Sequence, residues 1–433
     1  MIALALLASL TSNPSSPSNT ADAANAALDA AIARELPRTV EIRRRIHEHP
    51  ELGEREVETA KLVAARLREL GLVVREGVAK TGVVGVLTGG QPGGCAAWRA
   101  DMDALPVVEQ TALPFKSTKK ELWDGKEVGV MHACGHDVHT AVALGVAAVL
   151  ADPAVRKDLR GTVVFLFQPA EESLPDPGLH GAARMIAEGA LADPAPAAVF
   201  GLHCGPQLEV GTIGVRAGGA LAAADQIRIT VVGKQTHGAQ PELGIDPIVV
   251  ASHIVLALEN IPAREIDARE TLVLTIGKIE AGNRFNIIPE RAELLGTLRT
   301  HDPKVQARAH ERIREIAEGT AKTFGATAEV EIREFTPVTW NDPALLARTR
   351  PALELALGKA NVIDDKPVMG AEDFAFYGAK APGLFFFLGV APKGKAPPGQ
   401  LHTPTFDPDE GCIEVGLRAA TGILTSDPAA RPR

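Results

Sequence analysis

The chain has 433 residues, a net charge of −9 and a hydrophobic content of 45%. A chain of this length is longer than a domain with a single hydrophobic core usually is. Two domains are therefore expected, one inserted in the other. The acidic balance, with an isoelectric point near 5.8, and the lack of a basic tract argue against a nucleic acid as the partner.

The first 25 residues have the composition of a leader. Met1–Leu10 is a short apolar stretch, and Ala21-Asp22-Ala23 supplies small residues like those at signal-peptide cleavage sites. No Lys or Arg precedes Arg34, so the usual positive start is missing. We expect residues 1–25 to be a signal peptide or disordered leader and the protein to be periplasmic or secreted, with a cytoplasmic protein as the alternative. No apolar run approaches the roughly 20 residues of a membrane-spanning helix, so no integral membrane span is expected.

Residues 26–213 alternate between helical patterns and short apolar runs. Helices are predicted over residues 24–49, 56–70 and 140–150 from near-helical spacing of apolar residues. The apolar runs that predict strands are Val73-Val74, Gly82–Leu87, Ala96–Ala100 and Val163–Phe167. This rhythm predicts the first part of a catalytic α/β domain with a mixed, mostly parallel sheet, whose sites lie at the carboxyl ends of its strands.

A second unit is predicted over residues 214–332. Its strands and helices follow the order β-α-β-β-α-β, which is the ferredoxin-like α+β pattern. The predicted elements are Gln226–Val232, Pro247–Leu258, Thr271–Ile276, Ala292–Arg299, Pro303–Thr323 and Thr327–Ile332. Residues 333–425 then return to the first pattern, with a helix over Pro343–Leu357 and an apolar run at Phe385–Gly389, and residues 426–433 form a tail. The expected architecture is a discontinuous catalytic domain with an inserted dimerisation or lid domain.

Side chains that can bind a metal or move a proton are concentrated between residues 131 and 139: His132, Cys134, His136, Asp137 and His139. Cys134 and His136 offer sulfur and nitrogen donors two residues apart, and the glycine between them allows a tight turn. Such donors favour Zn²⁺, and added carboxylates leave Mn²⁺, Co²⁺ and Ni²⁺ open. A buried cysteine beside a hydrogen-bonded histidine is the structural alternative. Asp137 and His139 could support ligands instead of binding the metal.

Two pairs of carboxylates flank this cluster. Asp101 and Asp103 end an apolar strand, and Glu171 and Glu172 follow another. Solvated acidic side chains in turns are the alternative for each pair. The functional interpretation gives the adjacent glutamates different tasks: one binds metal, and the other accepts a proton from water.

His203 and His402 each follow an apolar residue, and alone either would be assigned a structural role. Together with the other donors they form a larger set: Cys134, His136, Glu172, His203 and His402. Five donors suffice for a two-metal site of the kind that hydrolases use, once water or a bridging carboxylate is added.

The motifs occur in a recognisable order: Arg-Ala-Asp-Met-Asp-Ala-Leu-Pro, His-Ala-Cys-Gly-His-Asp-Val-His, Pro-Ala-Glu-Glu, Gly-Leu-His and Leu-His-Thr-Pro. Over roughly residues 37–425 the chain resembles the hippurate hydrolase and N-acyl-amino-acid amidohydrolase family. This metallopeptidase family includes plant auxin–amino acid conjugate hydrolases and is related to aminoacylase and carboxypeptidase G.

The resemblance implies that Cys134, His136, Glu172, His203 and His402 bind two divalent metal ions per subunit. It implies that Glu171 is the general base and acid, and that Asp103 orients a partner in the metal site. Asp101 stands where related branches have a histidine ligand, a departure that is characteristic of this branch. Glu372, in Gly-Ala-Glu-Asp-Phe, would support the site.

In the inserted domain the resemblance implies a homodimer in which His237 reaches across the interface and polarises the substrate carbonyl. Asn286 and Arg299 would lie near the substrate carboxylate. Gln235 and Thr236 stand where the family usually has glycines before the histidine.

The implied reaction is hydrolysis of the amide bond of small N-acyl amino acids, such as N-acetyl or N-benzoyl conjugates, to an acid and a free amino acid. A dipeptidase or carboxypeptidase with the same metals is the alternative enzyme. A non-catalytic metal-binding scaffold is a further alternative, but it would not need Glu171 beside Glu172. A cysteine hydrolase built on Cys134 is disfavoured, because a metal-held thiolate is not a free nucleophile.

Overall fold

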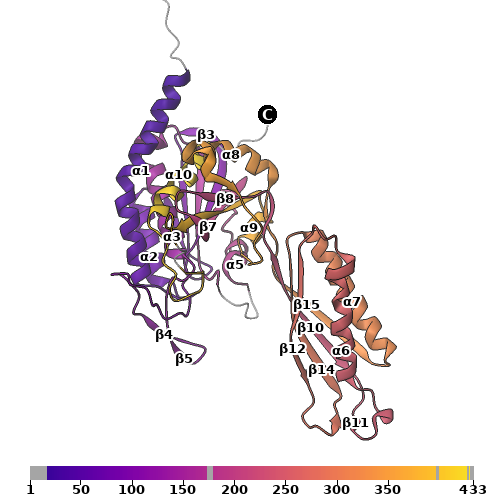
Figure 1. Cartoon of the computed structure of the whole chain (residues 1–433). Helices are drawn as coiled ribbons and strands as arrows, with labels where there is room; N and C mark the ends of the chain where they lie inside the picture. Colours follow the sequence, from indigo (N-terminus) through magenta and orange to yellow (C-terminus); the bar gives the residue numbers. More distant parts are fainter. Residues whose placement is uncertain (1–16, 173–178, 396–398, 427–428, 430–433) are drawn as a thin grey trace, which may run out of the picture.

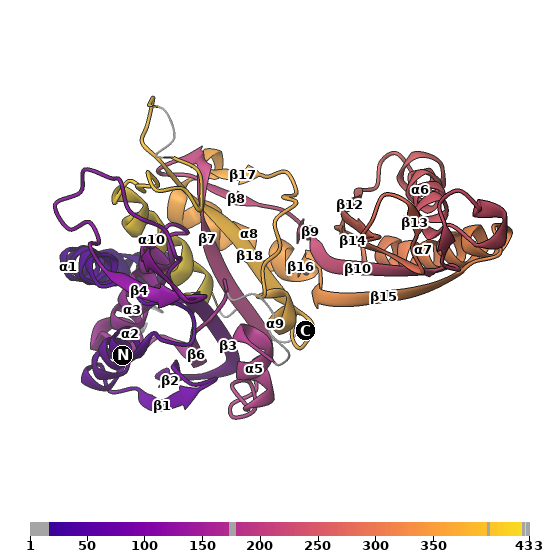
Figure 2. The same ribbon diagram turned by 90° about the horizontal axis from the view of Figure 1, so that it is seen from below.

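The computed structural model describes residues 17–172, 179–395, 399–426 and 429, which form two domains joined by two strands (Figure 1). The larger domain is built from the two outer parts of the sequence. The smaller one, from the middle of the chain, stands apart at the far end of β10 (Ala223–Val232) and β15 (Thr327–Thr336), as Figure 2 shows. No helix in the described ranges combines the length and apolar character that a bilayer crossing requires.

The larger domain contains its elements in two blocks. Before the insertion these are α1 (Pro17–Glu48), α2 (Val57–Glu69), β1 (Val73–Val78), β2 (Gly82–Thr88), β3 (Gln91–Asp101), β4 (Lys120–Trp123), β5 (Lys126–Gly129), α3 (His136–Ala151), α4 (Pro153–Arg156), β6 (Arg160–Gln168), α5 (Gly181–Ala187), β7 (Ala198–Glu209), β8 (Ile213–Val215) and β9 (Gly218–Leu221). After it come β16 (Thr339–Asn341), α8 (Pro343–Leu357), β17 (Val362–Asp364), α9 (Ala375–Gly378), β18 (Gly383–Ala391) and α10 (Gly411–Thr425).

The main sheet has eight strands in the order β1-β2-β6-β3-β7-β18-β8-β17. Pairs β6–β3, β3–β7, β7–β18 and β8–β17 are parallel, while β1–β2, β2–β6 and β18–β8 are antiparallel. The predicted mixed, mostly parallel sheet is therefore confirmed. Because β3, β6 and β7 run in the same direction, the loops at their carboxyl ends meet on one side of the sheet.

Both faces of this sheet are buried, as the continuous apolar runs require. Trp98 and Phe165 belong to the core shared with α1, α2, α3, α8 and α10. Their neighbours Ala97 and Val164 point to the other face, where they share a smaller core with α5 and α9. This alternation follows from the two-residue period of a strand.

The inserted domain has a four-stranded antiparallel sheet in the order β12-β14-β10-β15. Its remaining elements are β11 (Thr236–His237), α6 (Pro247–Leu258), β12 (Leu272–Ala281), β13 (Ile287–Ile288), β14 (Arg291–Thr300) and α7 (Pro303–Thr323). Helices α6 and α7 cover one face and enclose a core of their own. The connectivity and strand order are those of the predicted ferredoxin-like unit.

The boundaries differ in detail from those expected. The expected start of the insertion, at residue 214, falls inside β8, a strand of the main sheet. The inserted sheet begins with β10 at Ala223 and ends with β15 at Thr336. At the N-terminus, residues 1–16 of the expected leader lie outside the described residues, and residues 17–25 belong to α1, which was predicted to begin at residue 24.

Candidate metal centre and acid–base site

The five expected metal ligands lie together, although they come from four separate segments. His136 is the first residue of α3 and Cys134 lies two residues before it. Glu172 follows β6, His203 is on β7, and His402 lies between β18 and α10. Their candidate ligand atoms form two sets, one of Cys134, His136 and His203 and one of Cys134, Glu172 and His402. Within each set these atoms lie within 4.8 Å of one another.

Cys134 is common to both sets. Its Sγ atom is 3.3 Å from Nε2 of His203 and 3.3 Å from Nε2 of His402. On the other side, Nε2 of His402 lies 2.9 Å from Oε1 of Glu172. Sulfur, imidazole nitrogen and carboxylate oxygen therefore converge on one small volume, a donor set that suits Zn²⁺ and other late first-row divalent ions.

The hydrogen bonds of two histidines leave one nitrogen of each free to bind a metal. The Nδ1 atom of His203 donates to the carbonyl oxygen of Cys204 at 2.9 Å, so its Nε2 keeps a lone pair directed at the cluster. The Nδ1 atom of His136 lies 3.2 Å from Oδ1 of Asp103, and its buried Nε2 has no hydrogen-bond partner among the described residues. A ring held by one nitrogen with the other facing a donor cluster is typical of a metal ligand.

Asp103 contacts two parts of the cluster at once. One oxygen faces His136, and the other accepts the backbone N–H of Glu172 at 2.9 Å. The side chain is 1% exposed, so both contacts are shielded from solvent. The geometry matches the orienting role that the resemblance implied for this aspartate.

Asp101 and His139 orient the strand that carries His203. The Nδ1 atom of His139 lies 2.6 Å from Oδ1 of Asp101, and its Nε2 accepts the backbone N–H of Cys204 at 2.9 Å. Because both ring nitrogens are engaged, His139 is a support and not a metal ligand. Gly135 makes this packing possible, because a Cβ atom there would lie 2.6 Å from Sγ of Cys204.

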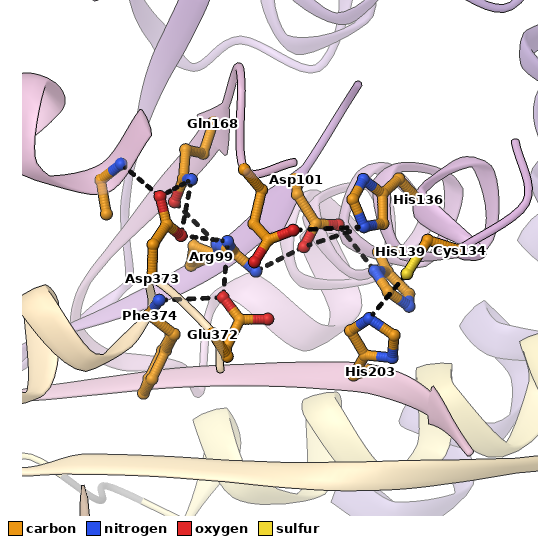
Figure 3. A network of polar contacts seen from close by, with 12 residues as sticks. Arg99, Asp101, Cys134, His136, His139, Gln168, His203, Glu372, Asp373 and Phe374 are labelled. Atoms are coloured by element: carbon orange, nitrogen blue, oxygen red, sulfur yellow. Dashed lines mark hydrogen bonds and ion pairs between the residues drawn. The ribbon is translucent and has the colours of Figure 1, made fainter. Parts of the chain in front are cut away.

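Arg99 is a fully buried cation beside the metal cluster. Figure 3 shows it between Asp101 and the pair Glu372 and Asp373. Its guanidinium pairs with Asp101, with Glu372 at 2.9 Å and with Asp373 at 2.8 Å, and its Nε donates to Gln168 at 2.8 Å. One cation faces three carboxylates, so negative charge remains in excess. Burial raises the pKa of Glu372 to about 8, because the charge of Asp373 adds to this effect and Arg99 offsets it only in part.

Glu171 is a largely buried acid at the edge of the cluster. Its side chain is 11% exposed, and its Oε2 lies 4.0 Å from Nε2 of His136. Burial, reinforced by the charges of Glu372 and Glu172, raises the pKa of Glu171 well above its usual value. A carboxyl group that binds a proton this readily, beside a metal-type donor set, suits a general base and acid.

Cys134 differs from an activated cysteine nucleophile. Burial, followed by the charges of Glu172 and Glu171, raises the pKa of the Cys134 thiol well above its usual value. Reactive cysteines instead have a lowered pKa in a positive environment. This thiol therefore needs a bound cation to ionise, which favours the ligand role over the nucleophile role.

The three residues expected at the substrate from the inserted domain lie in two separate places in this chain. His237, on β11, lies at the end of the inserted domain away from the metal cluster (Figure 1). Asn286 is beside it, since its carbonyl oxygen accepts the backbone N–H of Gly238 at 2.9 Å. Arg299 lies on β14 opposite Ala224, near the start of β10 and the larger domain. The structure therefore does not bring His237 or Asn286 to the cluster within one chain.

Sequence reasoning did not single out Arg99 or Asp373. Arg99 could have been found, because Arg99 and Asp101 are two residues apart on β3 and so share a face of the strand. Asp373 lies next to Glu372 in the Gly-Ala-Glu-Asp-Phe motif. It accepts the backbone N–H of Ala182 at 2.8 Å and so ties α5 to the Arg99 network.

Comparison with known proteins agrees with this geometry. The sequence pattern of peptidase family M20/M25/M40 matches residues 97–426. A thermostable carboxypeptidase of Saccharolobus solfataricus is 41% identical over 88% of this chain and 93% of its own length. An N-acetyl-L-cysteine deacetylase of Bacillus subtilis is 38% identical over 86% of this chain and 84% of its own. A solved Bacillus subtilis structure, described as a dinuclear metal-binding peptidase of family M20, is 35% identical with a TM-score of 0.75, covering 91% of this chain and 98% of its own.

The chain therefore belongs to peptidase family M20/M25/M40, and it is a hydrolase that acts on amide bonds. The family membership confirms the resemblance drawn from the motifs.

Proposed function

We propose that the protein is a metal-dependent amidohydrolase that cleaves N-acyl amino acids into an acid and a free amino acid. The observation that carries the proposal is the position of Glu171, an acid with a raised pKa that lies 4.0 Å from His136 inside a cluster of metal-type donors. The Bacillus subtilis relative named N-acetyl-L-cysteine deacetylase supports the substrate class.

The five donors Cys134, His136, Glu172, His203 and His402 would hold two divalent ions. Two donor sets that share Cys134 support a pair of ions, as does the solved relative described as dinuclear. The mixed sulfur, nitrogen and oxygen donors fit Zn²⁺, Mn²⁺, Co²⁺ or Ni²⁺. Divalent ions bound there acidify water and polarise a carbonyl group.

The protein's own groups then move the proton. Glu171 accepts a proton from the attacking water and returns it to the nitrogen of the departing amino acid. Asp103 holds the His136 ring and the backbone of Glu172 in place through its two oxygens. Arg99 limits the negative charge that surrounds Glu171.

A second subunit would supply His237 to the substrate carbonyl, with Asn286 and Arg299 near the substrate carboxylate. Dimerisation through the inserted domain is supported by the outer face of α6, where Ile248, Val249 and Leu256 are exposed, Leu256 by 71%. A patch of this kind on a surface helix is typical of a protein interface.

Carboxypeptidase activity is the second candidate, and the relative of Saccharolobus solfataricus favours it. Both activities would use the same cluster, and they differ in the group that precedes the scissile bond. The two activities can therefore be separated by comparing substrates that carry an acyl group before the scissile bond with substrates that carry an amino acid residue with a free amino group there.

The decisive experiment measures kcat/KM on matched substrates after reconstitution with Zn²⁺, Mn²⁺, Co²⁺ or Ni²⁺. N-acetyl and N-benzoyl amino acids should be hydrolysed faster than unblocked dipeptides that end in the same residue. Removal of the metal with a chelator should abolish activity, and adding it back should restore activity. Faster cleavage of dipeptides would favour the peptidase, and activity that survives chelation would favour a cysteine mechanism.

Export remains a separate proposal, supported by the apolar stretch Met1–Leu10 and the small residues Ala21-Asp22-Ala23. N-terminal sequencing of the protein made in its own host tests it. A mature chain that begins near Ala24 is expected, and an intact N-terminus in the cytoplasm would contradict export.

A further inference from the structure

The turn that delivers Glu171 and Glu172 contains a residue in an unfavourable conformation. Ala170 has φ of 56°, in the left-handed region that residues with a Cβ rarely adopt. It is buried two residues after the end of β6, directly before the two glutamates. An alanine stays in this region only when its surroundings hold it there.

Glu56 is the side chain that holds it. This carboxyl group lies fully buried at the start of α2, more than one hundred residues earlier in the chain. Its Oε1 accepts the backbone N–H of Ala170 at 2.8 Å, and its Oε2 accepts the hydroxyl of Thr81 at 2.6 Å. The turn that carries Thr81 packs against the same segment, because a Cβ atom at Gly82 would lie 3.0 Å from Cδ of Pro169.

The glutamate pair is therefore held from two sides. Glu56 binds the backbone just before Glu171, and Asp103 accepts the backbone N–H of Glu172 at 2.9 Å. Burial and then the charge of Asp103 raise the pKa of Glu56 to about 7. Burying this group is costly unless its hydrogen bonds are made, and the bonds it makes are those that fix the turn.

We propose that Glu56 is a positioning residue, which keeps Ala170 in the left-handed conformation and thereby directs the carboxyl group of Glu171 into the metal cluster. This inference rests on the proposed role of Glu171 as the general base and acid. The bond to Ala170 needs an oxygen acceptor and no negative charge, since a backbone N–H also donates to an amide carbonyl.

Two replacements of similar size test this. In Glu56→Gln the amide oxygen still accepts the N–H of Ala170, so kcat should stay within about threefold of wild type. Glu56→Met fills the same space without a hydrogen-bond acceptor. We expect kcat to fall by about 100-fold with little change in KM, because the carboxyl group of Glu171 moves away from the position in which it transfers the proton. Thr81→Val is the matched control. It removes the other bond to Glu56 and should lower the melting temperature while kcat is largely kept.

A second change makes the test independent of general stability. A glycine at position 170 adopts positive φ without strain. The double variant Glu56→Met with Ala170→Gly should therefore have a kcat about tenfold higher than that of Glu56→Met alone. If Glu56→Met alone cannot be purified, this double variant and Glu56→Gln decide the matter. A Glu56→Gln enzyme as inactive as Glu171→Gln would overturn the proposal, as would a double variant no better than about 100-fold below wild type.

A crystal structure of Glu56→Met, or of Glu56→Gln if the former does not fold, separates this inference from the proposed function. We expect positive φ at residue 170 in the glutamine variant and loss of it in the methionine variant. Residue 170 unchanged in the methionine variant would refute positioning, even if the wild type hydrolyses N-acyl amino acids. A wild type without that activity would refute the proposed function. The φ angle of residue 170 in the variants would still show whether Glu56 holds the turn.

Discussion

His139 and Asp101 form a 2.6 Å hydrogen bond in the protein interior, and this bond fixes which nitrogen of the histidine carries the proton. Because Asp101 accepts from Nδ1, Nε2 is left to accept the backbone N–H of Cys204. Cys204 is the neighbour of His203, a proposed metal ligand. A side chain that binds no metal therefore sets the position of one that would.

We predict that His139→Phe lowers metal affinity by about 10- to 100-fold, the usual effect of losing a group that orients a ligand. The replacement fills the space but leaves the N–H of Cys204 unpaired. His132→Phe is the matched control, since His132 is equally buried and neither of its ring nitrogens has a hydrogen-bond partner among the described residues. Competition with a chelator measures the affinity, and equal losses in both variants would contradict the orienting role.

Glu171→Gln should reduce kcat by about 10²- to 10⁴-fold, because it removes the group that transfers the proton. Metal content, measured by elemental analysis, should stay near wild type. The neighbouring variant Glu172→Gln should instead lose metal, because it weakens a proposed ligand. Near wild-type kcat in Glu171→Gln would show that another group is the base.

A mixture of two inactive variants should be active if His237 works across a dimer interface. Glu171→Gln lacks the base, and His237→Ala lacks the cross-subunit histidine. After unfolding and refolding together at equal amounts, hybrid dimers contain one intact site, so about a quarter of wild-type activity should return. Activity no higher than that of the separate variants would argue that His237 does not act in a partner's site, and light scattering would show whether a dimer forms.

His47 should make stability depend on pH. Its Nδ1 lies 2.9 Å from Asp137 and its Nε2 3.1 Å from Glu109. Burial opposes protonation, but these carboxylates outweigh it and raise the pKa of His47 to about 9. Because the folded pKa exceeds the unfolded value, the stabilisation is complete below pH 6.5 and is lost as the pH rises through 9. The loss amounts to roughly 3 kcal/mol.

Chemical unfolding at pH 6 and pH 9 checks this. The free energy of unfolding of the wild type should fall more between these pH values than that of His47→Gln. His49→Gln is the control, because His49 lies just after the end of α1 and its side chain is 69% exposed. Parallel pH dependence in the wild type and His47→Gln would contradict the ion-pair account.

Local sequence rules predicted three helices of this fold with their observed bounds. Helices α6, α7 and α8 each begin with proline after an aspartate. The side chain of Asp246 accepts the N–H of Ile248, and Asp302 and Asp342 make equivalent bonds. Both signals, the aspartate cap and the proline in the first turn, act within a few residues and so can be found in the sequence.

Other features depend on contacts between distant segments and could not be predicted in this way. Strand β8 is only three residues long and joins the main sheet through β18 and β17, so the sequence pattern predicts a start of the inserted domain that is too early. The motifs identified the donors that come together. Glu56 escaped notice because a single glutamate near the start of a helix has many ordinary uses, and only the bond to Ala170 distinguishes it.

The place of β18 in the main sheet has a consequence during synthesis of the chain. β18 pairs with β7, yet more than 170 residues separate the end of β7 at Glu209 from the start of β18 at Gly383. At about 5–20 residues per second, a ribosome needs on the order of ten to thirty seconds to make that stretch. During this interval the inserted domain is completed, at Thr336, while one edge of β7 still lacks its neighbour. The middle of the chain can therefore fold before the ends that surround it.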